Sequence, residues 1–198
     1  SQAVRVAIAT DSPRIADVAR AHGHEAIMTR ADHASGTERL AEAITLMELA
    51  EDTIVVNVQG DEPEIPPALI DALASCLASD PECPMATAVH PVQSVADWLN
   101  PNVVKVVADA EERALLFSRA PLPWSRSHLA WGLDAGTPQA RQAFEASRPL
   151  RHIGMYAYRS RFLTRYAQLA PCALEDIEAL EQLRVLHHGY RIKLLHTD

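Results

Sequence analysis

The chain has 198 residues, of which 48% are hydrophobic, and a formal net charge of −8 at pH 7. This size favours one well-buried domain with room for a small inserted arm. The acidic balance argues against a nucleic-acid binder, which would need clustered Lys and Arg to neutralise phosphates, and no apolar run reaches membrane-spanning length, so we expect neither nucleic-acid nor membrane partners.

Strands and helices are predicted to alternate through the first half of the chain. Strands are expected at 4–9, 26–28, 53–58 and 85–89, and helices begin at the capping signals near 12 and 35 and at the proline pair 66–67. The run Ile54-Val55-Val56 is typical of a central strand buried on both faces. Such alternation favours an α/β fold with a mixed, mainly parallel sheet.

The second half departs from this alternation. Residues 103–108 and 114–118 predict a hairpin, whereas 125–149 shows no clear periodicity and is interpreted as an extended excursion. We therefore expect 99–150 to be a hairpin and arm inserted into a single domain that spans 1–198. A strand at 151–159, helices at 162–169 and 174–188 and a closing strand at 192–196 complete it.

The cysteines indicate a reducing compartment. Cys76, Cys83 and Cys172 form no CxxC pair and are odd in number, so neither a zinc knuckle nor a disulfide framework is supported. We therefore expect a cytoplasmic location.

An acidic turn follows the apolar strand at 53–58. Asp61 and Glu62 come directly after Gly60, which has no side chain to obstruct a ligand. Ligands gather at the carboxyl ends of parallel strands, and paired carboxylates suit a hard cation such as Mg2+. The alternative, an ordinary surface turn with solvated acids, stays open on this motif alone.

The strand at 151–159 predicts a polar face that could bind a ligand. Alternation places His152, Tyr156 and Tyr158 on one face around Gly154, with donors that suit a hydroxyl-rich ligand such as a sugar. The alternative is a half-exposed strand with an incidental histidine.

The expected helix at 174–188 carries an acceptor-rich face. Glu178, Glu181 and Gln182 fall within one turn and share that face by their spacing. From these residues alone, the favoured interpretation is the solvated face of an amphipathic helix.

Two further places could hold an anionic or polar ligand. The segment 30–39 brings free backbone N–H groups to a helix start; a capping box explains Ser35 and Glu38, which leaves Asp32 and Arg39 beside His33. Arg119, at the end of the strand at 114–118, could pair with a ligand carboxylate, or with Asp97 or solvent. No nucleophile elbow, P-loop or dinucleotide fingerprint is present.

Six segments occur in a fixed order: 29–40, 57–63 (Asn57-Val58-Gln59-Gly60-Asp61-Glu62-Pro63), 100–107, 117–124, 151–156 (Arg151-His152-Ile153-Gly154-Met155-Tyr156) and 180–186. Together they resemble the 3-deoxy-manno-octulosonate (Kdo) cytidylyltransferase family. The resemblance covers nearly the whole chain except 127–148.

The resemblance implies a nucleotide-diphosphosugar transferase-like three-layer fold and a homodimer. It also implies Mg2+-dependent transfer of CMP from CTP to Kdo, which releases pyrophosphate and serves lipopolysaccharide biosynthesis. Asp61 is implied as the catalytic Mg2+ ligand that faces the sugar hydroxyl. The implied sugar-binding set is Gln59, Arg119, His152, Tyr156, Glu181 and Gln182, and the nucleotide side is Arg39 with Ser35 and Asp32.

The resemblance is incomplete at both ends. Members of this family begin with a strand and a basic, glycine-containing phosphate loop, and they carry a second metal-binding aspartate near the end; the 198 residues contain neither segment. We therefore expect the chain to be a portion of a longer protein. Two alternatives stay open, namely a cytidylyltransferase for another acidic sugar such as sialate, and a non-catalytic fragment that binds sugar or dimerises.

Overall fold

A computed structural model describes residues 1–33, 35–60, 64–127 and 134–197. It contains β1 (Ala7–Thr10), α1 (Pro13–Ala21), β2 (Glu25–Met28), α2 (Gly36–Leu46), β3 (Ile54–Asn57), α3 (Pro67–Ser79), β4 (Met85–Pro91), α4 (Val95–Leu99), β5 (Lys105–Ala108), β6 (Ala114–Ser118), α5 (Pro138–Ser147), β7 (Leu150–Arg159), α6 (Ser160–Tyr166), α7 (Ala173–Glu178), α8 (Gln182–His187) and β8 (Ile192–His196).

The helix starts follow the capping signals of the sequence. The Ser35 hydroxyl accepts a hydrogen bond from the Glu38 amide at 3.2 Å, which is half of the predicted capping box. Proline stands in the first turn of α1 and of α3, where the missing amide proton costs nothing. α5 starts in the same way, at Thr137 and Pro138, which corrects the extended excursion predicted at 125–149.

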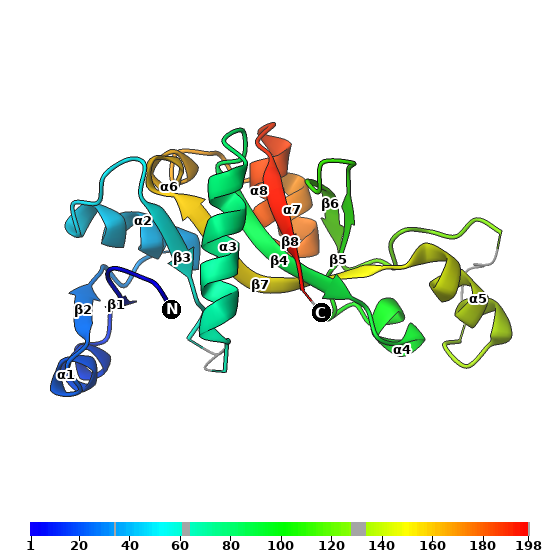
Figure 1. Cartoon of the computed structure of the whole chain (residues 1–198), viewed down its shortest axis with the longest axis horizontal. Coiled ribbons are helices and arrows are strands. Elements are labelled where there is room, and N and C mark those ends of the chain that lie inside the picture. The colour runs from blue at the N-terminus through cyan, green and yellow to red at the C-terminus, as the bar shows by residue number, and fades with distance from the viewer. Residues whose placement is uncertain (34, 61–63, 128–133, 198) are drawn as a thin grey trace.

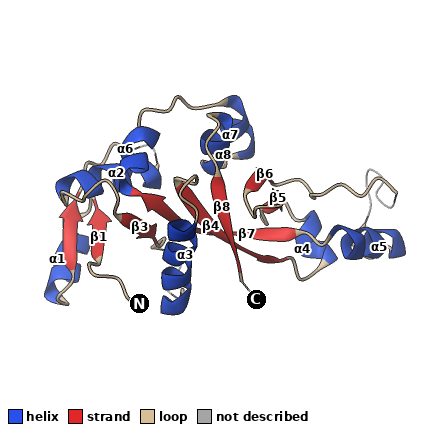
Figure 2. Ribbon diagram, turned by 45° about the horizontal axis from the view of Figure 1, so that its top comes forward, coloured by secondary structure: helices blue, strands red, loops and turns tan. Residues whose placement is uncertain are grey.

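One mixed sheet forms the middle layer (Figures 1 and 2). Its strand order is β6-β5-β7-β4-β8, and β3 also pairs with β7. β3, β4, β5 and β8 run in one direction while β6 and β7 run in the other. The predicted mixed α/β sheet is confirmed. Most of its strands run in one direction, but most hydrogen-bonded pairs are antiparallel because β7 separates β4 from β3 and β5.

The expected central strand lies at the margin of this sheet. Within the described residues β7 is the only strand that pairs with β3, and all four residues of β3 are partly rather than fully buried. β1 and β2 pair in parallel as a separate two-stranded sheet beside it. The apolar run therefore predicted the strand correctly but overestimated its burial.

Helices cover both faces of the sheet, which gives three layers. α3 packs on one face through Leu73 and Leu77, against Met155 and Ala157 of β7. On the other face, α2, α6 and α8 share the larger core with alternate residues of the same strands, including Met85 and Tyr158. The predicted α/β three-layer class is confirmed. None of the described helices is long and apolar enough to cross a membrane.

The predicted hairpin of 99–150 is β5 and β6, which pair antiparallel. Beyond it, α4 and α5 lie together at the end of the molecule away from β1 and α1 (Figure 1). Trp98 of α4 is fully buried and packs against Phe144 of α5, with ring centroids 6.0 Å apart. α5 of the predicted arm therefore forms a small helical pair with α4, which precedes the arm, and the pair has its own apolar core.

β7 carries three of the residues that line the candidate site, namely His152, Tyr156 and Tyr158. β5 pairs with Leu150 and Arg151, and β3 pairs with 156–159 along the same edge. On the opposite edge, the register with β4 shifts between Thr87 and Ala88, so that Gly154 and Met155 form a two-residue bulge. Because an even number of residues is inserted, the predicted alternation of 151–159 is preserved.

Candidate functional site

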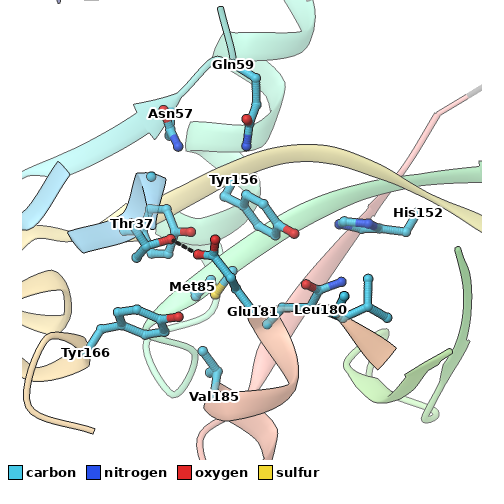
Figure 3. Close-up of a pocket in the computed structure, with 14 residues that line it drawn as sticks. Thr37, Asn57, Gln59, Met85, His152, Tyr156, Tyr166, Leu180, Glu181 and Val185 are labelled. Carbon is cyan, nitrogen blue, oxygen red and sulfur yellow. Dashed lines mark hydrogen bonds between the residues drawn. The ribbon is translucent and has the colours of Figure 1, made fainter. Parts of the chain in front are cut away.

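A cavity of about 240 Å3 lies between the start of α2, the sheet and the turn from α7 to α8 (Figure 3). Its described wall carries one carboxylate, from Glu181, and no lysine or arginine. Such a wall suits a ligand rich in hydroxyl groups better than a phosphate. The lining residues are Gly36, Thr37, Asn57, Gln59, Met85, His152, Tyr156, Tyr158, Tyr166, Ala179, Leu180, Glu181, Gln182 and Val185.

The cavity brings together five of the six residues in the predicted sugar-binding set. Gln59 follows β3, and His152 and Tyr156 come from β7. Glu181 and Gln182 complete the group from the start of α8. These five residues span more than 120 positions of the sequence, yet their side chains surround one space; their binding role stays a prediction.

A hydrogen bond from the first turn of α2 holds Glu181 in place. The Thr37 hydroxyl donates to Glu181 Oε2 at 2.9 Å. Burial raises the pKa of Tyr158 and of Tyr156, so both hydroxyl groups keep their protons.

The helix predicted at 174–188 is broken, which corrects the expected shared face. Ala179 has a φ of 50° and a ψ of 54°, in the left-handed region, and it separates α7 from α8. Glu178 consequently turns away from the cavity and accepts hydrogen bonds from the Ser118 hydroxyl at 2.6 Å and the Arg119 amide at 2.9 Å. Glu181 and Gln182 face the cavity because of this break.

Arg119, the sixth residue of the predicted sugar-binding set, is not among the residues that line the cavity. Its guanidinium donates to three backbone carbonyls, those of Glu178 at 2.6 Å, Pro101 at 3.0 Å and Ala179 at 3.4 Å. Arg119 thus stabilises the turn between α7 and α8, which carries Glu181, without lining the cavity itself. Its predicted contact with a sugar carboxylate stays a prediction.

Lys105 supports the same region from the interior. Its side chain is fully buried, and Nζ donates to the carbonyls of Asn100, Val103 and Arg119 at 2.5 to 2.8 Å. Burial lowers the pKa of Lys105 to about 8. One ammonium group therefore satisfies three carbonyls that belong to two different loops.

We expect Lys105→Met to lower the free energy of unfolding by about 2–3 kcal/mol, because interior carbonyls lose their donor. Urea unfolding of both proteins measures the difference. Lys193→Met is the matched control, since Lys193 donates to one carbonyl, that of Glu111, at an exposed position; we expect a change within about 0.5 kcal/mol. Equal losses in the two variants would contradict this role of Lys105.

Thr87 fixes the proton position on His152. The Thr87 hydroxyl lies 3.0 Å from His152 Nε2, 3.1 Å from the Ile153 carbonyl and 2.8 Å from the Met155 carbonyl. Carbonyls only accept, so they take the single hydroxyl proton, and His152 Nε2 donates to Thr87. Nδ1 of His152 is then left as an acceptor on a ring that lines the cavity.

His152 is neutral near pH 7. Burial lowers its pKa from 6.5 to about 3. Between these values the unfolded chain binds a proton that the folded chain does not bind, so folding becomes less favourable as the pH falls through this range. A neutral imidazole with one fixed donor and one fixed acceptor suits the recognition of a hydroxyl group.

Lowering the pH below about 6.5 is therefore expected to reduce the free energy of unfolding, by up to about 1.4 kcal/mol per pH unit from His152. His152→Gln removes this group, so its stability should fall less steeply between about pH 6.5 and pH 4. Urea unfolding of both proteins across this range tests the expectation. Identical slopes would show that His152 does not titrate as the geometry requires.

The predicted nucleotide residues lie around the start of α2. Arg39 donates to the Thr29 hydroxyl at 2.6 Å and pairs with Asp11 at 3.3 Å, and Ser35 caps the helix. Asp32 is exposed and lies 3.7 Å from Arg30. None of Arg39, Ser35 and Asp32 lines the cavity, but Gly36 and Thr37 of the same helix do. Their binding of nucleotide stays a prediction.

Asp61, the predicted metal ligand, lies outside the described residues, as does Glu62. Gln59, two residues earlier, lines the cavity. The described parts of the chain contain no group of three or more His, Cys, Asp or Glu side chains that could hold a metal ion.

The structure adds residues that sequence reasoning did not identify. Thr37 and Tyr166 line the cavity. Thr87 does not line it, but its hydrogen bond with Nε2 orients the His152 ring. Thr37 follows the capping residue of α2, and Tyr166 ends α6. Nothing in the local sequence marks either as polar lining, because their roles depend on how α2 and α6 pack against the sheet.

Comparison with known proteins agrees with this geometry. The family described as cytidylyltransferase matches residues 1–192. The 3-deoxy-manno-octulosonate cytidylyltransferases of Methylibium petroleiphilum and Verminephrobacter eiseniae are 56% and 54% identical to this chain, over 97% of it and 71% of each relative. A solved structure of CMP:2-keto-3-deoxy-manno-octonic acid synthetase complexed with CTP matches with a TM-score of 0.85 and 38% identity, over 100% of this chain and 73% of that one. This chain therefore belongs to the cytidylyltransferase family, among the 3-deoxy-manno-octulosonate cytidylyltransferases.

Proposed function

We propose that this chain transfers CMP from CTP to Kdo and releases pyrophosphate, in a pathway that supplies lipopolysaccharide. The observation that carries the proposal is the cavity wall, where His152, Tyr156, Glu181 and Gln182 offer donors and acceptors to a hydroxyl-rich ligand. The relatives at 54–56% identity are named for this activity, and the structural neighbour holds CTP.

In the proposed reaction the anomeric hydroxyl of Kdo attacks the α-phosphorus of CTP. A bond forms between the sugar oxygen and that phosphorus, the bond from the α-phosphorus to the bridging oxygen breaks, and pyrophosphate leaves with the bonding electron pair. The hydroxyl proton passes to solvent. Because phosphoryl transfer depends mainly on positioning and charge stabilisation, the role of the cavity residues is to orient the sugar.

The sugar and the nucleotide are proposed to lie on either side of the start of α2. The cavity wall carries the Glu181 carboxylate and no cation among its described residues, so phosphate groups would be repelled there. We place the nucleoside near Ser35 and Arg39, with Asp32, because Gly36 and Thr37 connect these residues to the cavity.

We propose Mg2+ as the cofactor, with Asp61 as its protein ligand. Mg2+ is usually held by one or two carboxylates together with substrate phosphates and water, so the carboxylate of Asp61, which follows the cavity residue Gln59 by two positions in the sequence, fits its donor chemistry. When bound, the ion would neutralise phosphate charge as the phosphorus–oxygen bond breaks.

We propose a homodimer in the cytoplasm. The large apolar side chains of Leu115 on β6 and Ile177 on α7 are 61% and 82% exposed, on elements joined by the hydrogen bond from Ser118 to Glu178. Light scattering should give twice the 21.7 kDa of one chain; the monomer mass would contradict the dimer.

Cys76, Cys83 and Cys172 are free thiols, which supports a reducing compartment.

Pyrophosphate release with CTP, Kdo and Mg2+ tests the proposed activity, in this chain and in the protein encoded by its complete reading frame. The expected result is release that requires all three components. Faster pyrophosphate release with sialate than with Kdo would show that the substrate is another acidic sugar. Kdo binding without turnover in both proteins would favour a non-catalytic sugar-binding role and overturn the proposal.

A further inference from the structure

Two buried polar atoms at the cavity have no hydrogen-bond partner. Among the described residues they are the Tyr166 hydroxyl and Nε2 of Gln182. Tyr166 is 1% exposed and Gln182 is 3% exposed, and both line the cavity. A buried polar group without a partner destabilises the free protein by about 1–3 kcal/mol, so such groups usually await a ligand or have a special role.

Two neighbouring side chains, Arg184 and Phe162, hold the Tyr166 ring. The Arg184 guanidinium lies over the ring, 5.0 Å from its centroid. Glu175 holds this guanidinium through two hydrogen bonds of 2.7 and 2.6 Å. Phe162 packs against the ring at 6.4 Å and 64°. These contacts restrict rotation of the Tyr166 side chain, whereas its hydroxyl proton is free to rotate.

The position of the hydroxyl group limits what it can recognise. Figure 3 shows Tyr166 with its hydroxyl pointing toward the space beside Glu181. Burial raises the pKa of Tyr166, so the group keeps its proton and can both donate and accept. The neighbouring Glu181 carboxylate would repel the carboxylate of an acidic sugar. A neutral sugar hydroxyl fits both neighbours.

We propose that Tyr166 is a specificity-determining residue that hydrogen-bonds one hydroxyl group of the sugar acid. This inference rests on the proposed function, because it takes a sugar acid as the occupant of the cavity. A rigid donor that is unpaired in the free protein gains its partner only when the correct sugar binds. A sugar that lacks that hydroxyl would leave Tyr166 buried and unpaired, and would therefore bind less well.

Tyr166→Phe tests the inference, because it removes the hydroxyl and keeps the ring. We expect the KM for Kdo to rise about 3- to 10-fold, the change that corresponds to the net free energy of one neutral hydrogen bond. The KM for CTP should change less than about twofold. The thermal midpoint of the free protein should stay equal or rise, since an unpaired buried group has been removed. Tyr190→Phe is the matched control, because the Tyr190 hydroxyl accepts from Arg165 at an exposed site.

Sugar analogues identify the hydroxyl that Tyr166 contacts. Each single deoxy analogue of Kdo is assayed with both proteins, and the penalty of Tyr166→Phe should vanish for the analogue that lacks the contacted group. The same penalty on every analogue, an unchanged KM for Kdo, or a lowered thermal midpoint would overturn the inference. Absence of turnover in the unsubstituted protein would instead overturn the proposed function, so the two failures are distinguishable.

Discussion

Arg184→Met is expected to lower the free energy of unfolding by about 3–5 kcal/mol. The Arg184 guanidinium donates two hydrogen bonds to the Glu175 carboxylate, and both side chains are only 9% exposed. This carboxylate raises the pKa of Arg184. Removing the cation leaves a buried carboxylate without its counter-charge, and desolvation of that charge is what destabilises the variant.

Urea unfolding of the variant and the unsubstituted protein measures this loss. Arg161→Met is the matched control: Arg161 lies 3.8 Å from Asp52, and their side chains are 56% and 91% exposed. An exposed pair contributes little, so we expect a change within about 1 kcal/mol. The paired replacement Arg184→Met with Glu175→Met should recover most of the stability, because no unpaired charge remains. A double variant as unstable as the single one would show that packing, and not charge, is responsible.

This ion pair also connects stability to the candidate site. Glu175 belongs to α7 and Arg184 to α8, so the pair joins the two helices across the break at Ala179. The Leu180 amide donates to the Glu175 carbonyl at 3.1 Å across the same turn. Because Glu181 and Gln182 follow this turn, the interactions that stabilise the turn also aim both side chains at the cavity.

The sequence predicted the features that depend on local pattern. Capping residues and prolines indicated where α1, α2 and α3 begin, and alternation indicated which face of β7 carries His152 and Tyr156. The resemblance to a family placed five residues at what the structure shows to be one cavity. These features are encoded over a few neighbouring residues, or in motifs that keep their order along the chain.

Other features depend on tertiary contacts that local pattern does not contain. The helix break at Ala179 uses a residue with no turn preference, and it is held by Arg119 and by the pair of Glu175 and Arg184. The apolar run of β3 indicated burial, but not which edge of the sheet the strand occupies. α5 was missed although Thr137 and Pro138 form a clear helix start, because the apolar pattern that follows them is weak.

Asp61→Asn is expected to reduce kcat at least about 100-fold. The proposed role of Asp61 is to hold the Mg2+ ion that neutralises the phosphates, and such charge stabilisation is worth several kcal/mol, of which each 1.4 kcal/mol corresponds to about a tenfold change in rate. Asparagine keeps the size of the side chain and one oxygen but removes the charge, so metal affinity should fall while the fold is retained. The Mg2+ concentration for half-maximal activity should rise accordingly.

Steady-state pyrophosphate assays across a Mg2+ titration, together with urea unfolding, separate these effects. Glu64→Gln is the matched control, because Glu64 is an exposed acid three positions further along the chain, and we expect its activity to stay within about twofold. If Asp61→Asn kept its turnover, the proposed metal role would be wrong. If it lost stability in proportion to activity, Asp61 would be a structural residue. Loss of turnover with a raised Mg2+ requirement and unchanged stability is the combination that a metal ligand requires.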